Sequence, residues 1–248
     1  MTELVHLDIA DQIATITLDS DHNRNALSRQ LVTELAQHLA TADADGDVRA
    51  ILIRSAGSVF CSGADLTEAS SGGMVEGAKG LVALQRQIAA GEKPVVVELG
   101  GPVRAGGLGI VGAADIVLSA ESVTFQLTEV RLGLAAAVIS LSLLPRFTDR
   151  SAAELFLTGR TFEATEAARI GLVTRAVPDE ELADAVRSTL ADLVKGYPQG
   201  LRETKKLLNA DLLDRIDALG DQVAAQSAAL FGSDEARDAM LAFLNRKK

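Results

Sequence analysis

Ser58-Val59-Phe60-Cys61-Ser62-Gly63-Ala64-Asp65-Leu66 is the stretch that decides the fold of this chain. It follows the apolar run 50–53, which predicts a buried strand, and it passes through small residues to a helix expected near Asp65. Small side chains leave backbone N–H groups open to a ligand, and a helix N-terminus adds unpaired donors and a positive dipole. The stretch therefore predicts a place that can hold an oxyanion. A second glycine turn, at Gly106-Gly107, is expected to complete it.

Composition narrows the class of protein. The 248 residues, 48% apolar and 23% charged, are typical of a globular enzyme with one α/β domain and an appendage. A net charge of −10, with 3% aromatic residues and no Trp, argues against nucleic acid as a partner. The single Cys excludes an intrachain disulfide and suits a reducing compartment.

No targeting or membrane segment is expected. The N-terminal residues 1–4 lack a basic region followed by an apolar stretch, so no signal peptide is predicted. Apolar runs stay shorter than a membrane span requires. We therefore expect a cytoplasmic protein without a membrane partner.

Strands and helices alternate in the first half of the chain, and helices dominate the second, which predicts the α/β class. Strands are expected at 5–10, 13–18, 48–53, 95–99, 116–119 and 123–125. Helices are expected at 29–42, 78–90, 108–113, 128–130, 137–147, 149–158, 164–170, 180–195, 198–210, 212–230 and 234–244. Residues 70–73 predict a flexible loop close to the site. We divide the chain into a core with the site, 1–195, and a helical part, 196–248, that serves oligomerisation or covers the core.

Several motifs together resemble the crotonase (enoyl-CoA hydratase/isomerase) superfamily, in order and in register from about residue 5 to residue 244. The central motif is F-x-x-G-A-D-L at 60–66. The others are Asn25-Ala26-Leu27, Ala105-Gly106-Gly107 with Ala114-Asp115-Ile116, Thr128-Glu129-Val130-Arg131-Leu132-Gly133-Leu134, Leu157-Thr158-Gly159, and Ala167-Ala168-Arg169-Ile170-Gly171-Leu172-Val173. The wording around residues 104–109 and 128–134 is closest to hydratases of branched, methylglutaconyl-type acyl-CoAs.

The resemblance implies a spiral of ββα units with a helical C-terminal part, assembled as a homotrimer or homohexamer. It implies an acyl-CoA thioester as substrate, with no cofactor apart from the coenzyme A that the substrate carries. Carried over by position, the two N–H groups that hold the thioester oxygen belong to Ala64 and Gly106. Each such donor contributes roughly 3 kcal/mol of transition-state stabilisation. Both residues lie in the glycine turns already noted, which agrees with the interpretation from the residues alone.

The same resemblance places Arg24, Ala26, Asp65, Leu66 and Gly107 against the acyl-CoA. The Arg24 cation suits a phosphate of the coenzyme, although an ordinary surface arginine is an equal interpretation. Asp65 is expected to cap a helix and fix the turn.

The acid–base residues depart from the family pattern. Hydratases of this family carry two glutamates, and the position of the first falls on Gly109, which has no proton-transfer group. The position of the second falls on Glu129, flanked by apolar Leu127 and Val130. Partial burial there would raise its pKa toward a useful general acid–base value, whereas a lone glutamate is by default a solvated surface group.

One glutamate leaves three functions open. Hydration of a 2-enoyl-CoA is the favoured hypothesis, with Glu129 both activating water and returning the proton. Isomerisation of a 3-enoyl-CoA to a 2-enoyl-CoA needs one base and is the alternative. A non-catalytic acyl-CoA binder is the third. Arg131 could face an extra carboxylate on the substrate, but a surface or interface role is the simpler interpretation.

Other chemistries find little support. Residues 107–112 satisfy G-x-G-x-x-G, yet the preceding strand ends at Leu99, too early for a dinucleotide-binding turn. Cys61 and Ser62 lack a base in a triad context, so Cys61 is interpreted as a small apolar residue. Three scattered histidines and one cysteine show no metal-ligand spacing, and no metal is expected.

Overall fold

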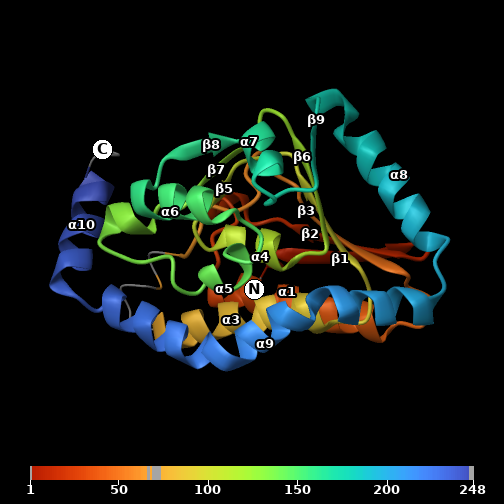
Figure 1. The fold of residues 1–248 in the computed structure, drawn as a ribbon, viewed down its shortest axis with the longest axis horizontal. Helices are drawn as coiled ribbons and strands as arrows, with labels where there is room; N and C mark the ends of the chain where they lie inside the picture. The colour runs from red at the N-terminus through yellow and green to blue at the C-terminus, as the bar shows by residue number, and fades with distance from the viewer. Residues whose placement is uncertain (1, 66–67, 69–73, 246–248) are drawn as a thin grey trace.

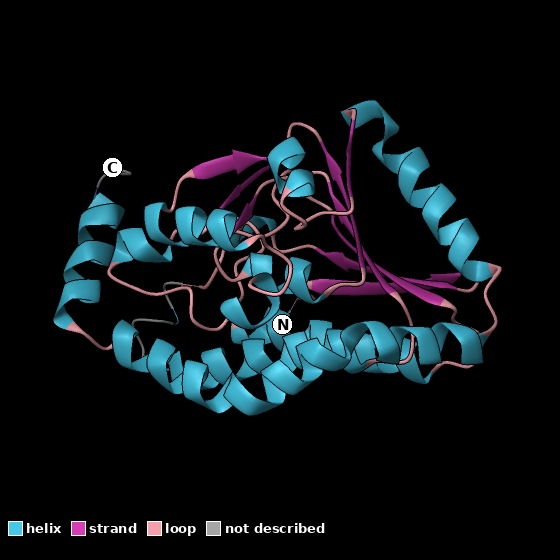
Figure 2. Ribbon diagram, viewed as in Figure 1, coloured by secondary structure: helices cyan, strands magenta, loops and turns pink. Residues whose placement is uncertain are grey.

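The computed structural model describes residues 2–65, 68 and 74–245, and its ribbon shows strands enclosed by helices (Figures 1 and 2). The larger sheet has six strands in the order β1-β2-β3-β4-β6-β9. Its members are β1 (Val5–Ala10), β2 (Ile13–Leu18), β3 (Ala50–Ser55), β4 (Val95–Leu99), β6 (Ile116–Ala120) and β9 (Arg175–Val177). β1 and β2 form an antiparallel hairpin, and every following pair is parallel.

A second sheet of three short strands has the order β5-β7-β8. Its members are β5 (Val103–Arg104), β7 (Thr124–Gln126) and β8 (Thr161–Glu163). The β5–β7 pair is parallel and β7–β8 is antiparallel. This small sheet fixes the turn at 105–107, because the Ala105 N–H donates to Gln126 O at 3.0 Å.

Helices connect and cover the strands. The α-helices are α1 (Arg29–Ala44), α3 (Met74–Ala90), α4 (Gly107–Ala113), α5 (Ser140–Leu143), α6 (Asp149–Thr158), α7 (Ala164–Arg169), α8 (Leu182–Val194), α9 (Pro198–Phe231) and α10 (Asp234–Asn245). The 3-10 turns are η1 (Asp21–Asn23), η2 (Glu129–Leu132) and η3 (Asp179–Glu181). α9 runs along one side of the molecule and packs against α3, while α8 packs on β3, β4 and β6 (Figure 1).

Local chemistry accounts for the elements that the sequence predicts well. The first four residues of β3, 50–53, are all buried, as expected for a strand inside a parallel sheet covered on both faces. Ser28 begins α1, where its Oγ accepts from Leu31 N at 3.2 Å. None of the helices in the described part of the chain combines the length and apolar character needed to cross a membrane.

Several predicted elements differ from the structure. The third strand lies at 50–55 rather than 48–53. Only Ser140–Leu143 of the predicted helix 137–147 is α-helical, because tertiary bonds compete: Val138 O accepts from Gln85 Nε2 at 3.2 Å. The predicted helices 198–210 and 212–230 form the single helix α9, since exposed Asp211 does not interrupt it. The predicted loop at 70–73 lies outside the described residues, as does the start of the helix expected near Asp65.

Candidate active site

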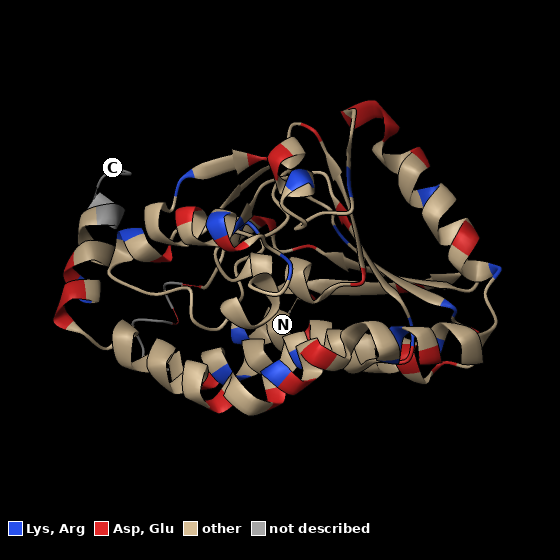
Figure 3. Cartoon of the chain, in the orientation of Figure 1, with Lys and Arg blue, Asp and Glu red and all other residues tan. Residues whose placement is uncertain are grey.

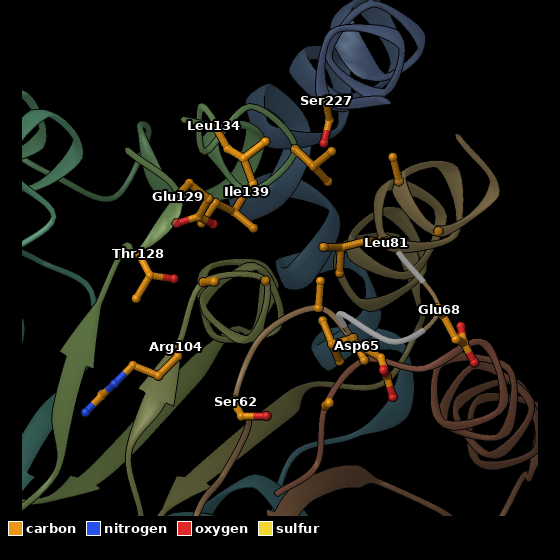
Figure 4. A pocket seen from close by; sticks show the side chains of 18 of the residues that line it. Ser62, Asp65, Glu68, Leu81, Arg104, Thr128, Glu129, Leu134, Ile139 and Ser227 are labelled. Atoms are coloured by element: carbon orange, nitrogen blue, oxygen red, sulfur yellow. The ribbon is translucent and has the colours of Figure 1, made fainter. Parts of the chain in front are cut away.

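One large cavity, of about 1380 Å³, lies where the central stretch of the sequence meets the helices. Its walls come from the end of η1, the start of α1 and of α3, the turns at 62–65 and 104–106, the segment 128–139, and the C-terminal helices α9 and α10. Figure 4 shows Ser62 and Asp65 at one end of the cavity and Glu129, Leu134 and Ile139 at another. Leu81 from α3 and Ser227 from α9 complete this view.

The two glycine turns are brought side by side by backbone pairing. Isolated parallel bridges join Leu27 to Ala64 and Cys61 to Val103. A Cβ built on Gly106 would lie 4.0 Å from Ala64 N, so both predicted N–H donors lie at the same spot in the cavity wall. The same Cβ would meet Leu27 Cδ1 at 2.9 Å, which explains why this position holds glycine. This geometry can hold one oxygen between two backbone donors.

The predicted acyl-CoA contacts are brought together in part. Arg24, Ala26 and Asp65 line the cavity, with Arg24 exposed and Ala26 buried. Asp65 Oδ2 accepts from Asn23 Nδ2 at 3.2 Å, and Leu66 lies outside the described residues. Gly107 is not brought to the cavity: it is buried, and a Cβ there would lie 2.7 Å from Cys61 Cβ. Its hydrogen side chain serves the packing of α4 against the 58–65 stretch.

Glu129 begins η2 and lines the cavity with its neighbour Thr128. Its Oε2 is buried and has no hydrogen-bond partner among the described residues. Burial raises the pKa of this carboxyl to about 7, against a small lowering by its own backbone N–H. An ionised Glu129 is therefore a base poised near neutral pH, the condition that general acid–base catalysis needs.

The position of the family's first glutamate is closed. Gly109 lies in α4 and is buried, and a Cβ on it would meet Ile139 Cγ2 at 3.1 Å and Gln85 Cδ at 3.3 Å. Ile139 lines the cavity at this place, while Gly109 itself does not. Sequence reasoning missed Gln85 and Ile139. The signal that could have found Gln85 is its helical spacing, four residues after Leu81 and three before Ile88, which places a polar residue on the apolar face of the predicted helix 78–90.

The rival chemistries can be examined at the same residues. Burial raises the pKa of the Cys61 thiol to about 12, so it is not a thiolate at neutral pH. The glycines of G-x-G-x-x-G lie within the buried helix α4 instead of in an open phosphate-binding turn. Within the described residues, no three His, Cys, Asp or Glu side chains gather as a metal site would require.

The positive charge at the site comes from a few basic side chains in the cavity wall. Acidic and basic side chains alternate along α8 and α9 (Figure 3). The basic residues that line the cavity are His22, Arg24, Arg29, Arg104 and Arg131. An anionic ligand would therefore be held by these groups and by backbone donors, against an overall charge of −10.

A mostly parallel sheet covered by helices, with the Ala64 and Gly106 turns and the Glu129 carboxyl lining one cavity, is typical of a crotonase-type enzyme. The chain belongs to the enoyl-CoA hydratase/isomerase family, whose model matches residues 8–248. The match takes in both turns and Glu129.

Individual relatives agree with this assignment. The crystal structure of an enoyl-CoA hydratase from Mycobacterium avium is similar with a TM-score of 0.92 and 43% identity, covering 99% of this chain and 98% of that one. A Thermus thermophilus protein, named provisionally as an enoyl-CoA hydratase, is 34% identical over 80% of this chain and 81% of its own. The short-chain-enoyl-CoA hydratase of Clostridium acetobutylicum is 28% identical over 98% of this chain and 95% of its own.

Proposed function

We propose that this enzyme adds water to a 2-enoyl-CoA thioester, with Glu129 as its single acid–base residue. The observation that carries the proposal is the buried Glu129 Oε2, which has no hydrogen-bond partner in the described part of the chain, in the cavity that the Ala64 and Gly106 turns also line. The hydratase names of the relatives support the choice of reaction.

Each step of the addition is assigned to a particular residue. Ionised Glu129 takes a proton from water while the water oxygen bonds to C3 of the substrate. The electron pair of the C2–C3 double bond moves to C2 and the thioester carbonyl, whose oxygen becomes an enolate held by the Ala64 and Gly106 N–H groups. Glu129 then returns its proton to C2, which gives the 3-hydroxyacyl thioester. No cofactor beyond the coenzyme A of the substrate takes part in this proposal.

Isomerisation is a second candidate, favoured by the closed wall at Gly109. Because Ile139 and Gln85 fill the place at Gly109, a second glutamate does not fit at that position. Glu129 would remove a proton from C2 of a 3-enoyl thioester, and the same two donors would hold the dienolate. Return of the proton to C4 would leave the double bond between C2 and C3.

The deciding experiment is a paired assay with a short 2-enoyl-CoA and the matching 3-enoyl-CoA, with products separated by chromatography. A 3-hydroxyacyl product from the 2-enoyl substrate supports hydration by one glutamate. A 2-enoyl product from the 3-enoyl substrate, without hydration, replaces the proposal by isomerisation. Binding of thioesters without turnover of either would favour the non-catalytic binder, or a branched substrate of the methylglutaconyl type.

The setting of the enzyme is part of the same proposal. We expect a cytoplasmic homotrimer or homohexamer, as the family resemblance implies. The exposed apolar side chains Leu157, Tyr197, Leu207 and Leu208, each at least 73% accessible in the single chain, are consistent with burial between subunits. Contacts of Arg24, Ala26, Asp65 and Leu66 with the coenzyme are likewise proposed.

A further inference from the structure

Gln85 is a buried polar residue that the mechanism above does not use. It lies on the apolar face of α3 and has no accessible surface. Its Nε2 donates to Val138 O at 3.2 Å and to Leu81 O at 3.3 Å, and its Oε1 accepts from Ser142 Oγ at 2.6 Å. The bonds to Val138 and Ser142 are buried, so their loss would leave buried polar groups unpaired.

This network joins three helices at the wall of the cavity. Ser142 on α5 is also fully buried, and its Oγ lies 3.3 Å from Gly109 O on α4. A Cβ on Gly112 would come within 2.7 Å of the same Oγ, so α4 offers glycines where the network sits. Two glycines of the G-x-G-x-x-G pattern, Gly109 and Gly112, therefore leave the space that the side chains of Gln85 and Ser142 occupy.

The segment that Gln85 holds carries the lining of the site. Val138 and Ile139 are 6% and 2% accessible and both line the cavity. Ile139 Cγ2 covers Gly109, and Figure 4 shows Ile139 and Leu134 projecting from the same side of the cavity as Glu129. The hydrogen bond from Gln85 Nε2 to Val138 O thus holds the segment whose apolar side chains line the cavity beside Glu129.

We propose that Gln85 is a positioning residue that holds Ile139 over Gly109 and so keeps the wall beside Glu129 apolar and closed. Packed side chains thereby occupy the position at which a second acid–base group would lie, and Glu129 acts as the single acid–base residue. This inference rests on the proposed catalytic role of Glu129. It holds equally for hydration and for isomerisation.

The test compares two glutamines of one helix. Gln85→Met keeps the approximate length and volume of the side chain but removes all three hydrogen bonds of the amide group. Gln87→Met is the matched control. Gln87 also lies on α3 and its Nε2 donates to Ala36 O at 2.8 Å, but this residue does not line the cavity. The pH dependence of kcat/KM is measured for each variant and for the parent enzyme.

Solvent access to Glu129 is the readout. The parent enzyme should gain activity as the pH rises through about 7, where burial places the pKa of Glu129. In Gln85→Met the wall loosens, water reaches the carboxylate, and this midpoint should fall by about one pH unit, with kcat falling about tenfold and KM little changed. Gln87→Met should keep the parent midpoint.

The charged side chains near Glu129 do not account for a difference in the pH midpoint between the variants. Among the described residues, burial alone raises the pKa of Glu129. The other charged or titratable side chains that line the cavity are His22, Arg24, Arg29, Asp65, Glu68, Glu76, Arg104 and Arg131. None of them is altered in either variant.

Each outcome decides the inference. A midpoint and kcat in Gln85→Met equal to those of Gln87→Met, with only the melting temperature lowered, would show a merely structural glutamine and overturn it. Should Gln85→Met fail to fold, Ser142→Ala removes one bond to Gln85 and must move the midpoint in the same direction by less; an unmoved midpoint there overturns it too. Absence of any thioester turnover by the parent enzyme would instead reject the proposed function.

Discussion

Glu129 is the residue on which the proposed chemistry depends, because its Oε2 is buried without a hydrogen-bond partner among the described residues and lines the same cavity as the Ala64 and Gly106 turns. Glu129→Gln keeps the shape of the side chain and removes its ability to take a proton. We expect kcat to fall by about 10²–10⁴-fold, the usual contribution of a general acid–base group. Calorimetric affinity for an acyl-CoA should stay within about twofold. Turnover at the parent rate would remove Glu129 from the mechanism.

The same carboxyl should make stability depend on pH. Its pKa is near 4.5 in the unfolded chain and about 7 when folded, so the folded state binds more protons between these values. The stabilising contribution is fully present below pH 4.5 and is lost as the pH rises through 7, by up to about 3 kcal/mol. The glutamine in Glu129→Gln does not ionise. The free energy of unfolding of this variant, measured by urea titration, should therefore increase relative to that of the parent enzyme as the pH rises from 5 to 8. A constant difference across that range would contradict the raised pKa.

Among the elements, the turns at Ala64 and Gly106 are the proposed oxyanion site. A methyl group in Gly106→Ala would lie 2.9 Å from Leu27 Cδ1 and 4.0 Å from Ala64 N. We expect kcat/KM to fall by about 10²-fold, on the scale of losing one such donor. Gly200→Ala on α9 is the control, because a Cβ there meets nothing within 4 Å. Equal steady-state kinetics in the two variants would argue against a hole at Gly106.

The elements also show what sequence could and could not predict. That Ala64, Gly106 and Glu129 lie near one another could be predicted, because each belongs to a short local motif, and all three line the cavity; their chemical roles stay predictions. Gln85, Ser142 and Ile139 could not, since they meet through helices far apart in the chain, and packing between helices leaves no local spacing. The predicted helix 137–147 is wrong for the same reason: Val138 O bonds to Gln85, and Arg146 Nε donates to Gly112 O at 3.2 Å.

On the scale of the whole molecule, a buried ionic cluster ties α9 to the core. Lys205, 3% accessible, places its Nζ 2.9 Å from Asp115 Oδ2 and donates to the carbonyls of Ile88 and Lys93. Asn209 Nδ2 donates to the other oxygen of Asp115 at 2.8 Å. The helix held in this way supplies Ser227 and Phe231 to the cavity wall, so the C-terminal helical part and the site are one packing unit. The division at residue 196 stays a prediction about the chain and marks no break in this packing.

Removing the buried cation should therefore destabilise the whole molecule. Lys205→Met leaves Asp115 in a nearly dry place without its counter-ion, and breaking such a pair lowers the free energy of unfolding by about 3–5 kcal/mol. For a chain of this size that corresponds to a melting temperature about 10 °C lower. Lys206→Met is the matched control, because Lys206 is 58% accessible and pairs with Glu203 at the surface, where an ion pair contributes about 1 kcal/mol or less. Scanning calorimetry of both variants separates the two cases, and equal melting temperatures would show that the attachment of α9 to the core does not depend on the Lys205–Asp115 pair.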